Sequence, residues 1–274
     1  MLLRYPGGKA KIYKKVQEII ATNDLSASVY CEPYAGGFGL GLKLLLKEDV
    51  KKFIINDFDK HIYALWYSVF YQPEKLIEKI QSIDITIQEW HRQKQIYNNY
   101  MKFDYRKKDD KVVVGFATLF LNRTNFSGIL TGGPIGGIEQ RGKYKLDCRF
   151  NKSKIISIIK ELAKYQDRVS IFNYDAIKLI EKLKSKEEKI FYNFDPPYVK
   201  KGKELYLNAY EEQDHTALEN RIESINAKWI MTYDNEKLIR DLYKDFAQRE
   251  LHLNYTVFSK RQAKEILISN FAFV

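Results

Sequence analysis

The chain has 274 residues, of which 46 are Lys or Arg and 35 are Asp or Glu, so its formal net charge is +11 at pH 7. This length allows one large domain, or a core domain with an inserted one, without disulfides for stability. A basic surplus of this size favours a polyanionic partner over a small neutral substrate. No apolar run approaches the length of about 18 residues that a membrane span needs, and Cys31 and Cys148 lie far apart, so we expect a cytoplasmic protein without membrane association.

The first part of the chain alternates between helical and strand patterns. Apolar residues at helical spacing predict a helix over residues 9–23. A short strand (29–31), a glycine-rich turn and a buried helix (40–46) follow, and a second strand (53–55) then leads into a further helix. This order is typical of a βαβα unit.

The same alternation returns after an interruption. Between about residues 72 and 167 the pattern changes to polar, aromatic-rich helices and a basic loop rich in glycine. We therefore expect an inserted, mainly helical domain at 72–167, with the core α/β domain formed by 1–71 and 168–274. Further strands are predicted in the core at 169–172, 190–194 and 229–231, and an antiparallel pair at 251–257 and 266–269.

Acidic residues follow the four predicted parallel strands, where ligands bind in doubly wound sheets. They are Glu32, Asp57, Asp175 and Asp195. An acid about twenty residues beyond the glycine loop suits the hydroxyl groups of a ribose, which favours a cofactor that contains a nucleoside. Each acid taken alone could instead be a helix N-cap.

Two common nucleotide motifs are absent. The glycine loop lacks the third glycine of GxGxxG because Leu42 stands there, which disfavours NAD. Gly8-Lys9 cannot belong to a phosphate-binding P-loop, since Leu3 and Ala10 occupy positions that need glycine and Ser/Thr. The loop could instead let a compact sulfonium nucleoside approach the chain. The four histidines show no metal-ligand spacing, so we expect no metal centre.

The most informative stretch is Asp195-Pro196-Pro197-Tyr198. Two prolines make the loop rigid and remove two N–H donors. A carboxylate and a proline carbonyl can accept both hydrogens of an exocyclic amine, while the aromatic ring stacks on a base. The sequence therefore predicts a loop that holds an amino-bearing base, with a rigid surface turn as the alternative.

Five motifs in this order resemble DNA adenine N6-methyltransferases of the Dam type, over nearly the whole chain. Their order resembles the α group of amino-methyltransferases, which implies a Rossmann-like S-adenosylmethionine-dependent methyltransferase sheet with an inserted target-recognition domain. The motifs are Arg4-Tyr5-Pro6-Gly7-Gly8-Lys9, Glu32-Pro33-Tyr34-Ala35-Gly36-Gly37, Ile55-Asn56-Asp57, Asn122-Arg123-Thr124-Asn125-Phe126-Ser127-Gly128 and Asp195-Pro196-Pro197-Tyr198.

The resemblance implies roles for individual residues. Asp57 is similar to the ribose-binding acid, Asp175 approaches the adenine of the cofactor, and Asp195 is shared between the cofactor and the target amine. Pro196, Pro197 and Tyr198 would hold a flipped adenine. The other residues implied to bind S-adenosylmethionine are Tyr5, Gly8, Lys9, Glu32, Pro33, Ala35, Gly36 and Gly37. Tyr5 stands where a tryptophan is common in the family, and Phe38 stands where a second glycine is common.

The insertion resembles the target-recognition module of these enzymes, which act on double-stranded DNA and extrude the target base. The residues implied to contact DNA are Asn122, Arg123, Thr124, Asn125, Arg141 and Lys143. The loop over 128–145 departs from the Dam sequence, so GATC specificity does not carry over. The expected setting is a prokaryote or its phage, with a restriction endonuclease as a conceivable partner. The alternatives are an RNA or other amino-methyltransferase and an inactive DNA-binding module.

Overall fold

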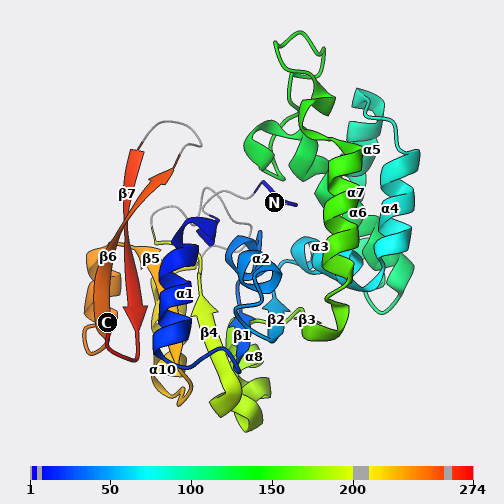
Figure 1. Ribbon diagram of the computed structural model, residues 1–274. Helices are drawn as coiled ribbons and strands as arrows, with labels where there is room; N and C mark the ends of the chain where they lie inside the picture. The colour runs from blue at the N-terminus through cyan, green and yellow to red at the C-terminus, as the bar shows by residue number, and fades with distance from the viewer. Residues whose placement is uncertain (1, 5–7, 200–209, 256–260, 274) are drawn as a thin grey trace. The chain divides into compact units, whose positions relative to one another are not determined.

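The computed structural model describes residues 2–4, 8–199, 210–255 and 261–273 (Figure 1). Contacts divide the chain into two compact units. The first unit comprises Met1–Pro6 and Asp59–Asn173, and the second comprises Gly7–Phe58 and Tyr174–Val274. The longer segment of the first unit thus interrupts the second unit in the sequence. The assignment of separate catalytic and recognition roles within the chain, at 1–71 with 168–274 and at 72–167, remains a prediction.

The second unit is built on a mixed sheet with the strand order β2-β1-β4-β5-β7-β6. Strands β2, β1, β4 and β5 pair in parallel, and β7 pairs antiparallel with both β5 and β6. The predicted α/β fold with an antiparallel pair at its edge is therefore confirmed. The strand bounds are β1 (Val29–Glu32), β2 (Lys52–Asn56), β4 (Ile190–Phe194), β5 (Trp229–Asp234), β6 (Ala247–Tyr255) and β7 (Arg261–Ser269).

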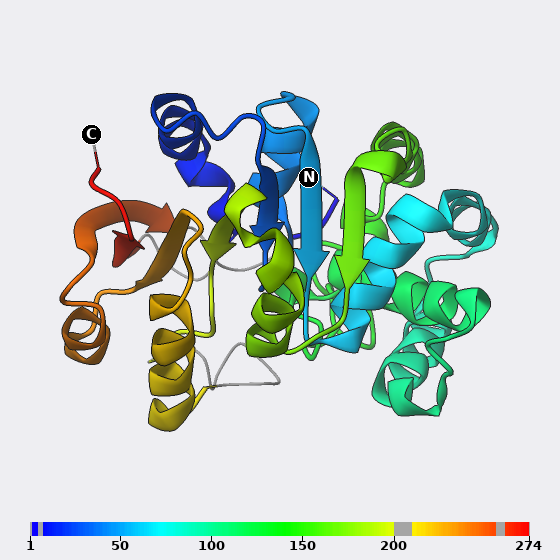
Figure 2. The same cartoon turned by 90° about the horizontal axis from the view of Figure 1, so that it is seen from below.

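Helices cover both faces of this sheet, with α1 and α2 on one side and α8 and α10 on the other (Figure 2). The parallel strands are consequently almost wholly buried, as their continuous apolar sequences require. The helix bounds are α1 (Tyr13–Thr22), α2 (Gly39–Leu46), α8 (Ala176–Leu183), α10 (Glu212–Glu223) and α11 (Lys237–Leu242), with shorter 3-10 turns η1 (Lys9–Ile12) and η6 (Lys184–Lys189).

Strand β6 corrects one expectation about the sheet edge. It begins at Ala247, whereas the apolar pattern predicted a start at 251, and the preceding helix α11 ends at Leu242. Residues 248–250 are polar and belong to an edge strand, where one side of the backbone faces no neighbouring strand. Pairing with β7 rather than hydrophobicity therefore sets the start of this strand.

The first unit is mainly helical, with α6 packed against α3 and α5. A Cβ atom at Gly115 of α6 would lie 2.6 Å from the carbonyl oxygen of Ala64 and from Oγ of Ser68 on α3, so glycine allows the two helices to approach closely. The elements are α3 (Lys60–Tyr71), α4 (Pro73–Ser82), α5 (Ile87–Asn98), α6 (Lys108–Thr124), α7 (Lys152–Ala163), the strand β3 (Val169–Phe172), and the 3-10 turns η2 (Tyr100–Lys102), η3 (Phe126–Gly128), η4 (Leu146–Arg149) and η5 (Gln166–Arg168).

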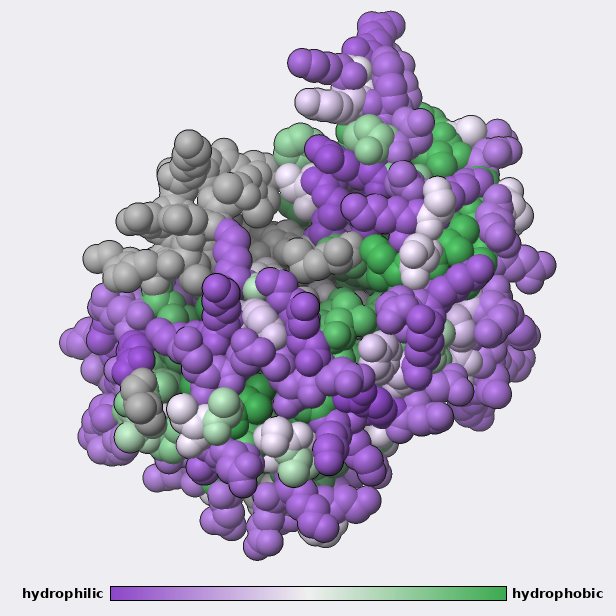
Figure 3. Space-filling view, in the orientation of Figure 1, coloured by the Kyte–Doolittle hydropathy of each residue, from purple (hydrophilic) through white to green (hydrophobic). Residues whose placement is uncertain are grey.

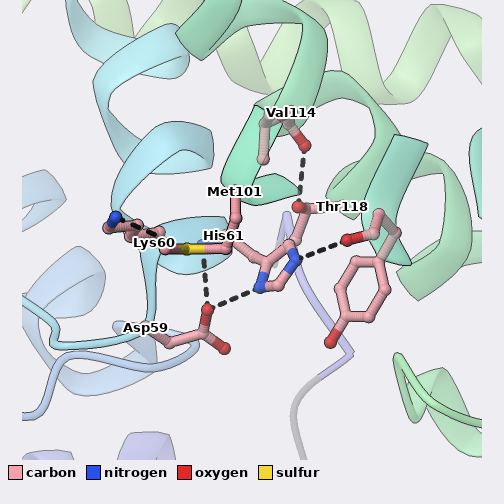
Figure 4. A network of polar contacts seen from close by, with 7 residues as sticks. Asp59, Lys60, His61, Met101, Val114 and Thr118 are labelled. Carbon is pink, nitrogen blue, oxygen red and sulfur yellow. Dashed lines mark hydrogen bonds and ion pairs between the residues drawn. The ribbon is translucent and has the colours of Figure 1, made fainter. Parts of the chain in front are cut away.

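A buried histidine fixes the start of α3 (Figure 4). Asp59 caps the helix by accepting the backbone N–H of His61 at 2.8 Å, and the same Oδ1 lies 2.7 Å from Nδ1 of His61. Nε2 of His61 lies 3.0 Å from the carbonyl oxygen of Tyr97, which can only accept, so Nε2 carries a proton. The ring of Tyr97 stacks on the imidazole at 3.9 Å. These contacts give His61 a structural role that joins α3 to α5.

No helix within the described ranges is both long enough and apolar enough to cross a membrane. In the same part of the chain, no group of three or more His, Cys, Asp or Glu side chains is placed to hold a metal ion.

Candidate active site and nucleic-acid interface

Asp195 directly follows β4 and forms the centre of a polar cluster in the second unit. Its Oδ1 atom lies 2.9 Å from Nζ of Lys9 and accepts a hydrogen bond of 3.0 Å from Oγ1 of Thr232. Among the described residues, the ion pair with Lys9 and the hydrogen bond from Thr232 both involve Oδ1. Burial raises the pKa of Asp195 despite the opposing effect of Lys9. These contacts hold the carboxyl group in place through Oδ1.

Lys9 connects the two ends of the Asp195-Pro196-Pro197-Tyr198 segment. Only 6% of Lys9 is exposed; this burial lowers its pKa, but the carboxylates of Asp195 and Glu265 outweigh the effect and raise the pKa overall. Its Nζ atom also lies 4.9 Å from the centre of the Tyr198 ring, within the range of a cation–π interaction. The structure therefore brings together the N-terminal lysine and the two side chains expected to contact a target base.

Within the Asp195-Pro196-Pro197-Tyr198 segment, Pro196 is buried, whereas Pro197 and Tyr198 are partly exposed. The ring of Tyr198 lies 6.0 Å from the ring of Tyr233 on β5. Gly8 is the N-cap of η1. Tyr5, which the sequence suggests as a stacking residue, lies outside the described residues.

The glycine loop after β1 is tied directly to the residues that end β2. Gly36 has a left-handed backbone with φ of +45°, and its N–H donates to Oδ2 of Asp57 at 2.8 Å. The N–H of Ala35 donates to the carbonyl oxygen of Asn56 at 2.9 Å. The structure thus brings the predicted glycine loop and the predicted ribose-binding acid into contact. Pro33 and Ala35 are buried in this loop, and Gly37 is partly exposed.

Asn56 joins three loops at the carboxyl ends of the strands. Its Nδ2 donates to the carbonyl oxygens of Pro33 and Tyr174, at 2.8 and 2.9 Å, and its Oδ1 accepts the N–H of Tyr174 at 2.9 Å. The side chain is fully buried. Asn56 was part of a recognised motif, but only the tertiary structure shows that it braces the site.

Glu32 points into the protein interior. Its Oε1 accepts hydrogen bonds from the hydroxyl group of Tyr30 at 2.8 Å and from the N–H of Gly41 at 3.0 Å. Burial raises its pKa to about 8, so the side chain is mainly protonated at neutral pH. In this arrangement Glu32 anchors the start of α2 to β1, while its expected contact with the cofactor remains a prediction.

Phe38, which stands where the resembled family commonly has a second glycine, has a left-handed backbone. Its φ is +46°, a left-handed conformation that costs a non-glycine residue roughly 1 kcal/mol. Its ring is buried and contacts Phe53 edge to face at 6.3 Å. A Cβ atom on Gly41 would lie 2.1 Å from this ring, so Gly41 provides the space that Phe38 needs. Burial of the ring offsets the backbone strain.

Asp175 is the N-cap of α8, and its Oδ1 accepts the N–H groups of Ile177 at 2.9 Å and Lys178 at 3.4 Å. The alternative that the sequence left open, a capping role, is therefore present in the structure. Burial raises the pKa values of the Tyr34 and Tyr210 phenols, and the charge of Asp175 raises both further. A contact with a cofactor adenine remains a prediction for this residue.

Sequence analysis missed several polar residues that contribute to the cluster. Thr232 interrupts the apolar run of β5, and a polar residue within such a run was the available signal. Glu265 lies between the polar and the apolar halves of β7, so its sequence gave no such signal. The hydroxyl groups of Tyr34 and Tyr210 form a hydrogen bond of 2.8 Å, and Tyr210 contacts the ring of His215. Tyr34 follows β1, whereas Tyr210 and His215 lie at the start of α10, so no local pattern links Tyr34 to the other two.

In the first unit, the predicted DNA-binding residues divide into buried and exposed groups. Asn122, Thr124 and Asn125 are almost fully buried. Asn122 bonds to both backbone groups of Arg4 and to the carbonyl oxygen of Gly128, at 2.8 to 2.9 Å. Oγ1 of Thr124 donates to the carbonyl oxygen of Phe120 at 2.8 Å.

The side chain of Asn125, like that of Asn122, bonds to groups of the protein itself. Its Oδ1 accepts from the indole N–H of Trp90 at 2.7 Å, and its Nδ2 donates to the carbonyl oxygens of Ile129 and Leu130. These side chains hold the loop that follows α6, and their burial argues against direct contact with DNA. Arg123 is partly exposed, and burial together with neighbouring Arg4 lowers its pKa.

Arg141 and Lys143 lie in the loop between η3 and η4, which Figure 1 shows in green and Figure 3 shows as mostly hydrophilic on its surface. Gln140 organises this loop through side-chain bonds with the backbone of Ile135, Gly137 and Leu146. Arg141 is 85% exposed and pairs with Glu139 at 2.8 Å. The loop thus presents basic groups on an internally bonded backbone.

A parallel sheet with a glycine loop after β1, an acid after β2 and an Asp-Pro-Pro-Tyr segment after β4 defines the class of S-adenosylmethionine-dependent amino-methyltransferases. Residues 5–257 match the family of D12 class N6 adenine-specific DNA methyltransferases, and the chain belongs to this family. The predicted enzyme class and methyl donor, S-adenosylmethionine, are confirmed by this membership.

Two named relatives are similar to the chain. The chain is 26% identical over 221 residues to the type II methyltransferase M.MjaIII of Methanocaldococcus jannaschii, which covers 77% of this chain and 73% of the relative. It is 21% identical over 288 residues to the type II methyltransferase M1.LlaDCHI of Lactococcus lactis subsp. cremoris, which covers 98% of this chain and 94% of the relative.

Proposed function

We propose that Lys9, Asp195, Pro196, Pro197 and Tyr198 form the catalytic centre of this DNA adenine methyltransferase. The observation that carries the proposal is the way Asp195 is held, since the ion pair with Lys9 and the hydrogen bond from Thr232 both involve Oδ1. We assign to Oδ2 the role of accepting a hydrogen of the adenine amine and orienting the nitrogen lone pair. The carbonyl oxygen of Pro196 accepts the second hydrogen, and the Tyr198 ring stacks on the extruded base.

The donor set of the second unit fits S-adenosylmethionine. Asp57 follows β2 and Asp195 follows β4. Gly36, with its left-handed backbone, donates its N–H to the carboxylate of Asp57. Asp57 would bind the ribose hydroxyl groups and Asp175 the adenine, with the remaining contacts from Lys9, Asp195, Gly8, Tyr5 and the loop residues Glu32, Pro33, Ala35, Gly36 and Gly37. When bound, S-adenosylmethionine supplies a methyl group activated by a positively charged sulfur.

The catalytic centre also has a group that can accept the proton released in the reaction. An amine nitrogen that gains a methyl group must release one hydrogen ion, and the partly buried carboxyl group of Asp195, whose pKa is raised, can take it at Oδ2. Lys9 keeps this carboxyl group in place through Oδ1. Positioning and electrostatic stabilisation are then the main contributions of the protein to the rate.

DNA recognition is assigned to the first unit. Arg141 and Lys143 would contact phosphates from the exposed loop, with Arg123 beside it, while Asn122, Thr124 and Asn125 support the loop from inside. The basic surplus of the chain agrees with a partner that carries many phosphates. Because both named relatives are type II methyltransferases, the chain would methylate a specific site, with a restriction endonuclease or an epigenetic mark as its context.

The test is a methylation assay with methyl-labelled S-adenosylmethionine and unmethylated genomic DNA, followed by digestion to nucleosides. The wild-type protein should place the label on N6-methyldeoxyadenosine. Asp195→Asn should reduce transfer by at least about 100-fold, because the variant cannot take the proton at Oδ2. Asp245→Asn, at an exposed position of the same unit, should retain transfer. A folded Asp195→Asn protein with full activity would refute the assignment.

A further inference from the structure

The end of strand β5 is bonded to both ends of the Asp-Pro-Pro-Tyr segment. Oγ1 of Thr232 donates to Oδ1 of Asp195 at 3.0 Å, where the segment begins. Oδ1 of Asp234 accepts the N–H of Val199 at 3.2 Å, directly after the segment ends. Tyr233 lies between these two residues of β5, so its position along the segment is set by bonds on either side.

The ring of Tyr233 contacts the aromatic ring of the segment. The centres of the Tyr233 and Tyr198 rings lie 6.0 Å apart, and the two ring planes are tilted by 34°. Tyr233 is fully buried, whereas Tyr198 is partly exposed. Aromatic rings at this separation interact in a way that depends on their relative orientation. The buried ring of Tyr233 therefore provides a fixed surface for the partly exposed ring of Tyr198.

A buried histidine holds the Tyr233 ring in turn. Nδ1 of His215, in the first turn of α10, forms a hydrogen bond with the hydroxyl group of Tyr233. Burial lowers the pKa of His215 and raises the pKa of Tyr233, so the bond joins two uncharged groups at neutral pH. The hydroxyl group lies on the long axis of the ring, so this bond fixes the direction in which the ring points.

His215 is itself packed between two tyrosines. Its ring lies 5.5 Å from the Tyr233 ring and 5.5 Å from the Tyr210 ring, in both cases edge to face. The hydroxyl group of Tyr210 is bonded to that of Tyr34, which belongs to the loop after β1. The imidazole is thus held by contacts on two sides.

We propose that Tyr233, held by His215, is a positioning residue that sets the orientation of the Tyr198 ring for stacking on the extruded adenine. This inference rests on the proposed function of the same site, in which Tyr198 stacks on the target base. The rate of transfer depends on how accurately the base is placed, so a small rotation of its stacking partner lowers that rate.

The decisive experiment measures the single-turnover rate of methyl transfer from labelled S-adenosylmethionine to unmethylated genomic DNA, with the full-length protein. Tyr233→Phe removes only the hydroxyl group and should lower this rate about fivefold, which corresponds to about 1 kcal/mol, the net contribution of one hydrogen bond. Tyr243→Phe is the matched control, because it removes the same group from a buried ring 6.5 Å from Tyr233. The control should keep the wild-type rate.

A double-mutant cycle separates action through Tyr198 from a general structural role. In a Tyr198→Ala background, Tyr233→Phe should change the rate by less than about twofold, because the ring that Tyr233 orients is gone. Equal losses in both backgrounds would show that Tyr233 acts elsewhere and would overturn the inference. A wild-type rate in the Tyr233→Phe single variant would overturn it as well.

Two variants of His215 cover the case in which Tyr233→Phe does not fold. His215→Leu removes Nδ1 and should lower the rate about fivefold, whereas His215→Asn, whose amide lies near the place of Nδ1, should stay within about twofold of wild type. Equal rates for these two variants would count against the inference. If wild-type protein placed no label on adenine, the proposed function would fail and this inference with it. Wild-type transfer that Tyr198→Ala weakens and Tyr233→Phe leaves unchanged would remove this inference alone.

Discussion

Replacement of Asn56 by alanine tests how the site loops are held together. The side chain makes three hydrogen bonds of 2.8 to 2.9 Å to backbone groups of Pro33 and Tyr174, and it is fully buried. A hydrogen bond of this kind contributes about 1 kcal/mol net. We therefore expect Asn56→Ala to lower the free energy of unfolding by about 3 kcal/mol, because buried backbone groups also lose their partners.

The assay is unfolding in urea, monitored by circular dichroism. With a denaturant slope near 2 kcal/mol per M, a loss of about 3 kcal/mol lowers the midpoint by about 1.5 M. Asn220→Ala is a suitable control, since Asn220 is exposed in the same unit and makes a single bond of 2.9 Å to the carbonyl oxygen of Thr216. The control should shift by less than about 0.5 kcal/mol.

The same variant should also affect the cofactor. The three loops that Asn56 joins carry Pro33, Asp57 and Asp175, so their loosening should weaken S-adenosylmethionine binding. If Asn56→Ala lost less than about 1 kcal/mol of stability, the bonds would not be rigidly formed in solution. The interpretation of Asn56 as the brace of this site would then be refuted.

Three further predictions concern packing, pH and DNA. Gly41→Ala should lower the free energy of unfolding by about 1–3 kcal/mol, because its Cβ atom would overlap the Phe38 ring. A Cβ atom at Gly133 meets no atom within 4 Å, so Gly133→Ala is the control and should leave the stability unchanged. Equal effects of the two variants in thermal or urea unfolding would contradict this packing. Glu32 has a folded pKa of about 8 against an ordinary value of 4.5, so between these values the native state keeps a proton that the unfolded state has released. As the pH rises from 5 to 8, the free energy of unfolding of the wild type should therefore fall relative to that of Glu32→Gln, by up to about 1.4 kcal/mol per pH unit. Melting curves across that window check it, and a constant difference between the two proteins would exclude a protonated Glu32. Replacing Arg141 and Lys143 together by alanine should lower the slope of log Kd for DNA against log salt by about 1.8, if each contacts one phosphate, with unfolding unchanged; a slope equal to wild type would remove both from the interface.

The sequence by itself determined the class of the fold and the main chemical motifs. The strands predicted at 29–31, 53–55, 190–194 and 229–231 all occur, because buried parallel strands need short apolar runs that a sequence displays directly. The Asp-Pro-Pro-Tyr segment and the glycine loop were also readable, since each depends on consecutive residues. The family assignment followed from the order of such local motifs.

Only the tertiary structure decided which side chains within these motifs face the site. Asn122 and Asn125 belong to a motif that suggested DNA contact, yet their amides bond to the backbone of the protein itself. Burial depends on which distant segments cover a residue, and no local pattern records that. For the same reason Glu265, 70 residues beyond Asp195 in the sequence, became part of the site only when β7 paired with β5.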